Sequence, residues 1–302
     1  MNILIIGGSY FAGRVFTMIA SKEGHRLTLI NRGKYSMKDF GARKEFVCER
    51  HDYGTLSTLP LDKSYDAVID FCAYERGDIS DVAKNLPCVF HRYIYISTAE
   101  VCAQTEDVRD EASSLERKAP ENRIEEYTYN KMLLEEELVT CAKVGGFTYT
   151  ILRPVFIYGP YNYAPRESWY IQNIMEHKPV PHPVDAEAKF QMVYVKDVAR
   201  AILSAVGNDQ AADQIYMLSA PEIVTYGSFL ERLRSVSDIA FEILPVTVEA
   251  VLKENIPLPF PLLASENKLF SGEKIVRELG FEYGDPEESM RLTFQAFKDV
   301  FS

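Results

Sequence analysis

The sequence predicts a doubly wound α/β fold, in which helices cover both faces of a parallel sheet. Apolar runs of strand length alternate with periodic segments of helix length through the first half of the 302-residue chain. The runs are continuously apolar, as is typical of strands that are buried on both faces. The helices between them provide the crossovers that parallel pairing requires.

The elements follow in order from the N-terminus. NILII is an apolar strand, and Gly-Gly-Ser then opens a helix over about 11–22. Gly24-His25 forms the next turn. A long, acidic helix is expected over about 125–143, because its residues repeat with helical period. Further apolar runs predict strands at residues 26–30, 44–48, 65–71, 92–97 and 147–154.

After Pro154 the composition changes. Residues 158–185 are rich in aromatic residues, Pro and Gly, which is more typical of a loop or binding surface than of a sheet core. The α/β pattern then returns with the strand FQMVYV, the helix KDVARAILSAV and the strand QIYMLS. From about Ala220 short helices mix with a proline-rich link. We therefore expect one large α/β domain and a smaller companion.

The charge balance limits the partners. The chain has 33 Lys and Arg residues against 44 Asp and Glu, a formal net charge of −11. A broad phosphate-binding face would have to be strongly local, so we expect no duplex nucleic-acid partner. The net charge is still compatible with a local pocket that binds a phosphorylated small molecule.

The cysteine and histidine patterns indicate neither disulfides nor a metal site. Five widely spaced cysteines without a CxxC pair predict buried, reduced thiols and a reducing compartment. The five histidines lack metal-ligand spacing. The N-terminal apolar run is too short for a signal sequence, and no stretch approaches about 20 apolar residues. We therefore expect a cytoplasmic protein without a membrane span.

The turn after the first strand has the spacing of a dinucleotide-binding loop. Gly7, Tyr10 and Gly13 occupy a G-x-x-G-x-x-G pattern in which Tyr replaces the middle Gly. The first Gly allows a tight turn, the last allows close packing of helix on sheet, and a pyrophosphate can lie at the helix N-terminus. A plain strand-to-helix turn is the alternative. In the dinucleotide-binding interpretation, Tyr10 can act simply as a bulky lid on the pyrophosphate loop. The position directly between strand and helix favours dinucleotide binding.

The end of the second strand bears on the choice of dinucleotide. An acidic residue there would bind the ribose 2′-OH and repel a 2′-phosphate, but the chain has Asn31 and Arg32. A guanidinium suits phosphate, so NADP is favoured, with NAD as the alternative. A solvated Arg in a turn is the other interpretation of Arg32. Asp52, after the third strand, is placed for the adenine edge or for a helix cap.

A tyrosine, a lysine and a hydroxyl form the candidate catalytic group. Tyr127 and Lys131 have Y-x-x-x-K spacing on the predicted helix and share one face. Roughly one such pair is expected by chance, so the spacing alone decides nothing. The lysine charge can lower the phenol pKa from about 10 and hold a cofactor ribose. Ser97 or Thr98, at the end of the preceding strand, would hydrogen-bond the substrate oxygen during hydride transfer.

Six segments in order carry a resemblance to a known family: ILIIGGSYFAG, YDAVIDFCAY, YIYISTAEV, Tyr127–Lys131, LRPVFIYGP and FQMVYVKDVA. Over nearly its whole length the chain resembles an extended short-chain dehydrogenase/reductase of the NAD(P)-dependent epimerase/dehydratase family. The resemblance implies a Rossmann-like sheet and catalytic positions at Thr98, Tyr127 and Lys131. The Asn-Arg-Gly at 31–33 is similar to the branch that includes chloroplast stem-loop-binding proteins and isoflavone-reductase-like enzymes. The implied cofactor positions are Gly7, Tyr10, Phe11, Arg32, Asp52, Phe71 and, through its backbone, Pro154.

Departures from the family pattern narrow the substrate. Where the dehydratases have Thr-Asp-Glu, this chain has Thr98-Ala99-Glu100, so the acid is missing and sugar 4,6-dehydration is disfavoured. Phe156 stands where many sugar-nucleotide members have an Asn that contacts the diphosphate, and Cys102 replaces a usual Tyr. The aromatic residues at 158, 161, 163, 169 and 170 either stack on a base or sugar or pack the small domain against the large one.

The pattern and the resemblance together predict the organisation of the chain. An NAD(P)-binding domain covers 1–157 and about 188–219, and a substrate-binding domain covers 158–187 and 220–302. The resemblance also implies a homodimer formed through the long helix. The acidic face of that helix is predicted to be solvated and would oppose such a contact; it consists of Glu125, Glu126, Glu135, Glu136 and Glu137.

Two functions from different classes fit these observations. The first is an NAD(P)-dependent oxidoreductase or epimerase acting on a secondary alcohol or keto group, including that of a sugar or nucleotide sugar. The NADP preference favours a reductase, and the family average favours an epimerase. The alternative is a catalytically silent NADP-sensing or RNA-binding protein on the same fold. The Tyr127–Lys131 pair argues against loss of catalysis, and the acidic charge argues against RNA.

Overall fold

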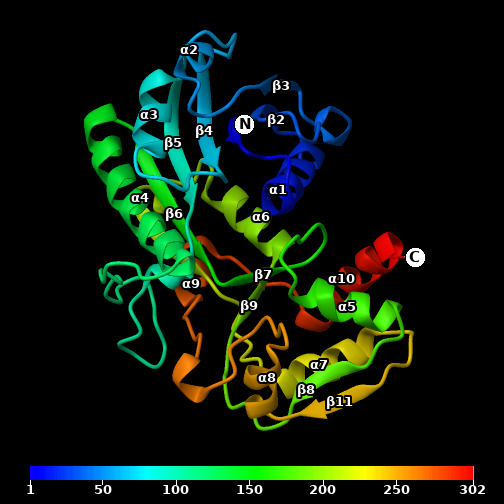
Figure 1. Ribbon diagram of the computed structural model, residues 1–302. Helices are drawn as coiled ribbons and strands as arrows, with labels where there is room; N and C mark the ends of the chain where they lie inside the picture. The colour runs from blue at the N-terminus through cyan, green and yellow to red at the C-terminus, as the bar shows by residue number, and fades with distance from the viewer. Residues whose placement is uncertain (302) are drawn as a thin grey trace.

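The centre of the molecule is a parallel sheet, seen in a computed structural model that describes residues 1–301 (Figure 1). Within these residues the sheet has seven strands in the order β10-β6-β5-β4-β1-β2-β3, and all neighbours pair in parallel. The doubly wound parallel sheet predicted from the sequence is confirmed. Its strands are β1 (Asn2–Ile6), β2 (Arg26–Asn31), β3 (Lys44–Val47), β4 (Ser64–Asp70), β5 (Val89–Ile96), β6 (Thr148–Pro154) and β10 (Gln214–Leu218).

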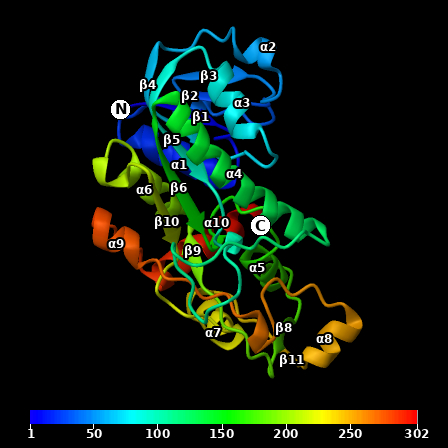
Figure 2. The same ribbon diagram turned by 90° about the vertical axis from the view of Figure 1, so that its left-hand side faces the viewer.

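Helices cover both faces of this sheet. α1 and α6 pack together on one face, whereas α2, α3 and α4 pack side by side on the other (Figure 2). The α-helices are α1 (Phe11–Lys22), α2 (Tyr53–Leu56), α3 (Asp78–Asn85), α4 (Arg123–Gly145), α5 (Glu167–Met175), α6 (Val195–Ala205), α7 (Tyr226–Val236), α8 (Val248–Glu254), α9 (Glu273–Leu279) and α10 (Pro286–Phe301). Short 3-10 helices are η1 (Lys38–Phe40), η2 (Ala99–Val101), η3 (Asp209–Ala211) and η4 (Ala264–Glu266).

The strand order places a crevice beside β1. The chain moves outward from β1 to β2 and β3, and then crosses to β4 on the other side of β1. Helices leave β1 and β4 toward opposite faces at this reversal, which opens a gap at the carboxyl ends of the strands. Ligands of open α/β sheets bind at such a point. The topology therefore directs attention to the residues that follow β1 and β4.

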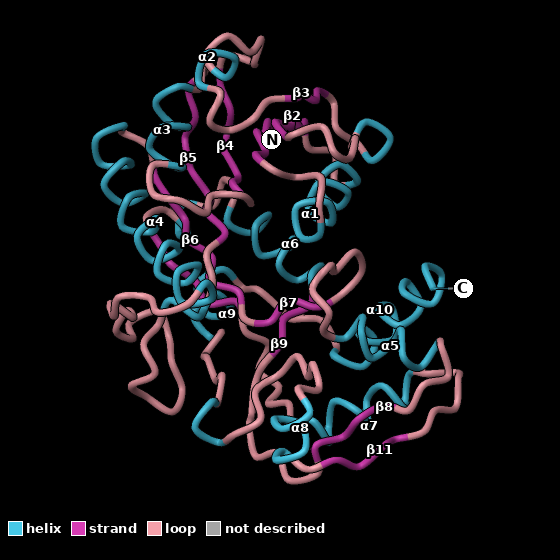
Figure 3. Tube along the Cα trace, in the orientation of Figure 1, coloured by secondary structure: helices cyan, strands magenta, loops and turns pink. Residues whose placement is uncertain are grey.

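The C-terminal part adds two small sheets (Figure 3). β7 (Phe156–Tyr158) pairs with β9 (Met192–Tyr194), and β8 (Val180–Pro183) pairs with β11 (Ile243–Val246). α5 lies within the 158–185 segment that the sequence indicated as loop or binding surface. It forms because Tyr170, Ile171 and Ile174 recur with helical spacing and are buried.

One apolar core joins the sheet to the C-terminal helices. It includes Ile5 of β1 and Phe16 of α1, and it extends to Phe190 and to Phe297 of α10. Phe260 stacks on Phe190 with ring centroids 4.4 Å apart. The two parts therefore share one continuous buried apolar core.

The acidic face of α4 differs from the expectation. Glu135 is buried and pairs with Arg153 on β6, with Nη2 and Oε2 2.6 Å apart. Glu137 accepts backbone hydrogen bonds from Gly77, Ile79 and Ser80 at the start of α3. The expectation of solvation is therefore wrong for these two glutamates, because both contact neighbouring elements.

Candidate active site

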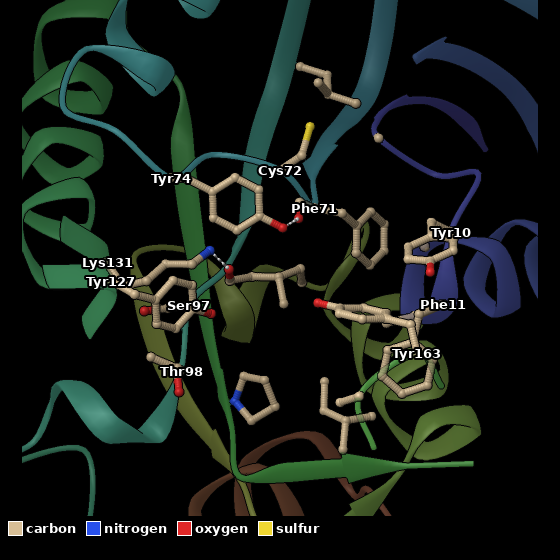
Figure 4. Close-up of a pocket in the computed structure, with 18 of the residues that line it drawn as sticks. Tyr10, Phe11, Phe71, Cys72, Tyr74, Ser97, Thr98, Tyr127, Lys131 and Tyr163 are labelled. Carbon is tan, nitrogen blue, oxygen red and sulfur yellow. Dashed lines mark hydrogen bonds between the residues drawn. The ribbon is translucent and has the colours of Figure 1, made fainter. Parts of the chain in front are cut away.

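A cavity of about 1000 Å³ opens at the carboxyl ends of the parallel strands (Figure 4). Its walls come from the segment that follows each of the strands β1 to β6, from α4 and from the loop 159–166 that precedes α5. Pro259 and Lys268 of the C-terminal part complete the lining. The predicted site residues that line it are Gly7, Tyr10, Phe11, Gly13, Asn31, Arg32, Phe71, Thr98, Tyr127, Lys131 and Pro154. Sequence positions spread over about half of the chain thus meet around one space.

Two glycines shape the turn after β1. Gly7 has φ +94°, and a Cβ there would lie 2.9 Å from the Sγ atom of Cys72. A Cβ on Gly13 would lie 2.9 Å from the Cα atom of Gly8. Neither contact is tolerable, because both are closer than real Cβ atoms come. The turn is thus a tight backbone cradle at the start of α1, the arrangement that accommodates a pyrophosphate.

Aromatic side chains surround this turn. Tyr10, in place of the middle Gly, stacks on Tyr35 with centroids 5.6 Å apart and on Tyr163 at 5.0 Å. Phe11 follows with φ +36°, a left-handed conformation that a bulky residue rarely adopts. Its ring meets the edge of Tyr163 at 6.0 Å. The lid that the sequence suggested at Tyr10 is therefore a three-ring stack that joins three segments of the chain.

The turn after β2 presents cations at the cavity rim. The Asn31 side chain accepts from the Gly33 backbone N–H at 2.7 Å and donates to Glu45 at 2.8 Å. Asn31 therefore shapes the turn through its side chain. Arg32 and Lys34 are exposed and line the cavity. They are available to a phosphorylated ligand at this end.

Asp52 is not among the residues that line the cavity. Its carboxylate caps α2, accepting from the backbone N–H of Thr55 at 3.0 Å and from the Thr55 hydroxyl at 2.6 Å. Glu49, three residues earlier, lines the cavity instead. Of the two positions open to Asp52, the structure shows the helix cap. The loop after β3 contributes to the cavity through the residues just before Asp52.

A buried ionic network next to the glycine turn was missed by sequence reasoning. Arg50 pairs with Asp70 at the end of β4, with Nη2 and Oδ2 3.0 Å apart. The Tyr93 hydroxyl donates to the same carboxylate at 2.6 Å. Arg50 also donates to the Asp78 carbonyl at 2.6 Å. The only sequence signal was an Asp within an apolar strand, since a buried carboxylate requires a partner.

Lys131 lines the cavity and is held there by two backbone carbonyls. Its Nζ donates to the carbonyls of Ala73 at 3.0 Å and Ile96 at 2.9 Å. The rings of Tyr74 and Tyr95 lie 4.8 and 4.7 Å from the same nitrogen. Burial lowers the pKa of Lys131 to about 8, because the charged form is poorly solvated there.

Tyr127 lies one helical turn before Lys131 on the same face of α4. The Lys131 Nζ is 5.8 Å from the centre of its ring. Tyr127 is 43% exposed as a whole residue, but its side chain lies in the concave wall of the cavity. Partial removal from water in this wall raises the pKa of Tyr127 to about 12. Tyr163 raises the pKa further, whereas the charge of Arg166 lowers it.

The structure distinguishes between the two hydroxyls at the end of β5. The Ser97 hydroxyl donates to Glu135 at 2.5 Å and belongs to the buried Glu135–Arg153 pair. Both residues line the cavity, but the Thr98 Oγ1 only accepts, from the Glu100 backbone N–H at 3.3 Å. The Thr98 proton is left to donate into the cavity. Thr98 is therefore the better-placed hydroxyl.

Glu100, the candidate base of a dehydratase, is engaged. Its carboxylate pairs with Lys268 across the cavity, with Oε2 and Nζ 2.5 Å apart. Across residues 1–301, no group of three His, Cys, Asp or Glu side chains gathers closely enough to hold a metal ion. In the same residues no helix is long and apolar enough to cross a membrane.

Comparison with known proteins shows which sequences and structures the chain is similar to. Residues 78–219 match the sequence profile of the NAD dependent epimerase/dehydratase family. The chain is 31% identical over 238 residues to the chloroplast stem-loop binding protein of 41 kDa b of Arabidopsis thaliana, covering 74% of this chain and 60% of that protein. It is 25% identical over 157 residues to the UDP-glucose 4-epimerase of Vibrio cholerae, covering 52% and 47%. The chain thus spans about half to three fifths of these relatives.

Solved structures show the same fold. The UDP-glucose 4-epimerase of Thermotoga maritima, crystallised with UDP-glucose, has a TM-score of 0.77 at 18% identity and full coverage of both chains. The UDP-glucose-4-epimerase of Stenotrophomonas maltophila, with bound NAD and formylated UDP-arabinopyranose, has 0.79 at 15% identity, covering 99% of this chain and 98% of that one. At these identities the likeness concerns the fold alone. Together with the family profile it confirms the resemblance carried by the sequence motifs.

Proposed function

On the premise that the chain belongs to the NAD dependent epimerase/dehydratase family, we propose that it is an NAD(P)-dependent oxidoreductase or epimerase. Its substrate is a secondary alcohol or keto compound, with sugars and nucleotide sugars as the first candidates. The observation that carries the proposal is the convergence of Thr98, Tyr127 and Lys131 on a cavity that continues to the glycine turn. The Vibrio and Thermotoga epimerases support this substrate class by their names.

The residues present fit a nicotinamide dinucleotide. The cradle at Gly7 and Gly13 leaves no room for side chains and can receive a pyrophosphate. Arg32 and Lys34 at the rim favour the 2′-phosphate of NADP, and NAD remains the alternative, since related structures hold NAD. When bound, the dinucleotide supplies hydride exchange. Lys131, buried next to Tyr127, is the residue we assign to its ribose.

The chain's own groups handle the proton. With a pKa raised to about 12 by burial, Tyr127 is protonated at neutral pH and can donate its proton to a keto oxygen. Thr98 donates a hydrogen bond to the same oxygen, and Lys131 favours the phenolate by its charge when protonated. In the reverse direction it is the Tyr127 phenolate that accepts the hydroxyl proton. Dehydration stays disfavoured, because Ala99 supplies no acid and Glu100 is paired with Lys268.

The predicted domain division belongs to the same proposal. Residues 1–157 and about 188–219 would bind the dinucleotide, and 158–187 with 220–302 would bind the substrate. Arg166, Pro259 and Lys268 support the second assignment, because these residues of the C-terminal part line the cavity. A cytoplasmic homodimer remains a prediction from the sequence.

The proposal is tested by following NADPH oxidation at 340 nm with a panel of keto substrates, and by mass spectrometry of the dinucleotide that co-purifies. A reductase consumes NADPH stoichiometrically, whereas an epimerase retains NAD and shows no net absorbance change. We expect Tyr127→Phe to lower kcat by about 100- to 10,000-fold while dinucleotide binding is kept. Full activity of this variant would refute the role of Tyr127.

The similarity to the Arabidopsis stem-loop binding protein favours a second candidate, an RNA-binding or NADP-sensing protein without catalysis. The net charge of −11 opposes it. Gel-shift titration with stem-loop RNA at two salt concentrations separates the two. Salt-sensitive RNA binding, together with tight NADP binding and no turnover over the substrate panel, would replace the enzyme proposal.

A further inference from the structure

Most cations around the cavity already have a counter-charge or a role. Arg50 is neutralised by Asp70, and Lys268 by Glu100. Lys131 donates to two backbone carbonyls. Arg32 and Lys34 are exposed at the far end, beside the turn after β2. Among the lining residues within 1–301, this leaves one cation without an assigned partner or role.

That cation is Arg166, the residue before α5. Its side chain is partly buried and lines the cavity. The guanidinium donates to the Ile157 carbonyl at 3.3 Å and lies 5.0 Å from the centre of the Phe156 ring. Among the described residues, 1–301, no carboxylate forms an ion pair with it. Burial lowers the pKa of Arg166, which marks a cation that the protein only partly compensates.

The neighbouring carboxylate is committed elsewhere. Glu167 is fully buried and accepts from the Gly159 backbone N–H at 2.9 Å. Its two oxygens also accept from the Asn162 amide at 2.9 and 3.1 Å. These bonds tie the loop 159–166 to the first turn of α5. Glu167 thus holds the loop in shape and leaves Arg166 facing the cavity.

A second contact fixes the same loop from the opposite wall. Tyr163 stacks on Tyr10 of the glycine turn, with ring centroids 5.0 Å apart. Loop 159–166 is therefore anchored at Gly159, Asn162 and Tyr163, ahead of Arg166. A preorganised guanidinium with free N–H groups is suited to a planar or tetrahedral group of anionic oxygens.

We propose that Arg166 binds an anionic group, a carboxylate or a phosphate, which the substrate carries near the hydroxyl or keto carbon on which Tyr127 acts. The proposal rests on the proposed function and adds a substrate class to it. Arg166 and Tyr127 line the same cavity, and the Arg166 charge acts on the phenol. The position differs from the family's diphosphate contact, which this chain lacks because Phe156 stands there.

The test measures binding to the NADP-loaded protein through the fluorescence of Trp169, the one tryptophan of the sequence, three residues from Arg166. The probes are UDP, UDP-glucose and UDP-glucuronate, together with free glucuronate and inorganic phosphate. The variants are Arg166→Gln and Arg166→Lys, and Arg117→Gln serves as an exposed control outside the cavity. NADP binding is titrated separately for each protein.

We expect Arg166→Gln to weaken binding of the preferred anionic probe by about 10- to 100-fold, with Arg166→Lys between it and the wild type. Loss confined to glucuronate-containing probes identifies a carboxylate as the bound group, and loss confined to phosphate identifies a phosphate. An equal loss for UDP, UDP-glucose and UDP-glucuronate would place Arg166 at a diphosphate and overturn the proposal. The proposal would also be overturned if the wild-type protein bound NADP but bound none of these anionic probes. Failure of both NADP and NAD to bind would refute the proposed function instead.

Discussion

At the scale of single residues, the buried charge of Lys131 links function to stability. The pKa of Lys131 is lowered by burial to about 8, below the 10.5 of an ordinary lysine. Between these two values the unfolded chain binds more protons than the folded one, so stability rises with pH. Below about pH 8 the folded protein must hold a poorly solvated cation. We interpret this cost as the consequence of keeping an ammonium group beside Tyr127.

A pH-dependent comparison tests this interpretation. Relative to Lys131→Met, the free energy of unfolding of the wild type should increase by about 2 kcal/mol between pH 7.5 and 9.5. The measurement is urea unfolding at both pH values. Lys143→Met, which removes an exposed lysine from the same helix, should show no such increase. A constant difference between wild type and Lys131→Met would contradict the lowered pKa.

Single residues also show how far sequence reasoning reached. Motif spacing predicted Tyr127 and Lys131, because helical geometry places positions i and i+4 on one face. Asp52 was ambiguous, since a carboxylate after a strand is equally suited to capping the next helix. Arg50 and Asp70 were missed, because their pairing joins loops that follow different strands and no local period reports it. Short-range chemistry was predictable, and partnerships across the sheet were not.

At the scale of elements, a buried ion pair fastens α4 to the sheet. Glu135 on α4 contacts Arg153 on β6 through two hydrogen bonds, at 2.6 and 3.0 Å, and accepts a third from Ser97, the residue after β5. Glu135 lies on the same helix as Tyr127, and its partner Ser97 directly precedes Thr98. It therefore fixes the helix that carries the tyrosine relative to the strand that carries the threonine.

Removing one partner should be costly. Glu135→Ala leaves Arg153 buried without a counter-charge and should lower the free energy of unfolding by about 3–5 kcal/mol. Glu136→Ala, next to it on α4, removes an exposed partner of Arg117 and should cost less than about 1 kcal/mol. Chemical denaturation measures both. Similar losses for the two variants would show that burial of the pair is unimportant.

Loop 159–166 provides the second prediction at this scale. Because Tyr163 stacks on Tyr10 above the glycine turn, it should slow the release of a bound dinucleotide. Tyr163→Ala should speed NADP dissociation by about 2- to 10-fold, the equivalent of one aromatic pair. Stopped-flow displacement measures the rate. Tyr163→Phe keeps the ring and should dissociate like the wild type, and equal rates for the Ala and Phe variants would exclude stacking as the cause.

At the scale of the whole molecule, the parallel sheet was predictable and the small sheets were not. Continuous apolar runs such as that of β1 identify the buried strands, and the alternation with helices determines their direction. β8 and β11 are short and about 60 residues apart in sequence, and no residue of β11 is fully buried. α5 was hidden because Pro and Gly flank it. Such pairings depend on the tertiary surroundings, so local composition does not report them.

The shared core predicts how the whole molecule responds to a ligand. Ile5 in the sheet and Phe297 in α10 belong to one apolar cluster. Unfolding of either half would therefore expose apolar surface of the other half to water, which couples the unfolding of the two halves. Thermal unfolding should therefore show a single transition. NADP at 100 times its Kd should add about 2.7 kcal/mol and raise Tm by about 4 °C for a chain of this size. At the same concentration NAD should raise Tm less, if Arg32 and Lys34 contact the 2′-phosphate. Differential scanning calorimetry with NADP, NAD and AMP decides this: two transitions, of which NADP moves only one, would mean that the cluster does not couple the halves.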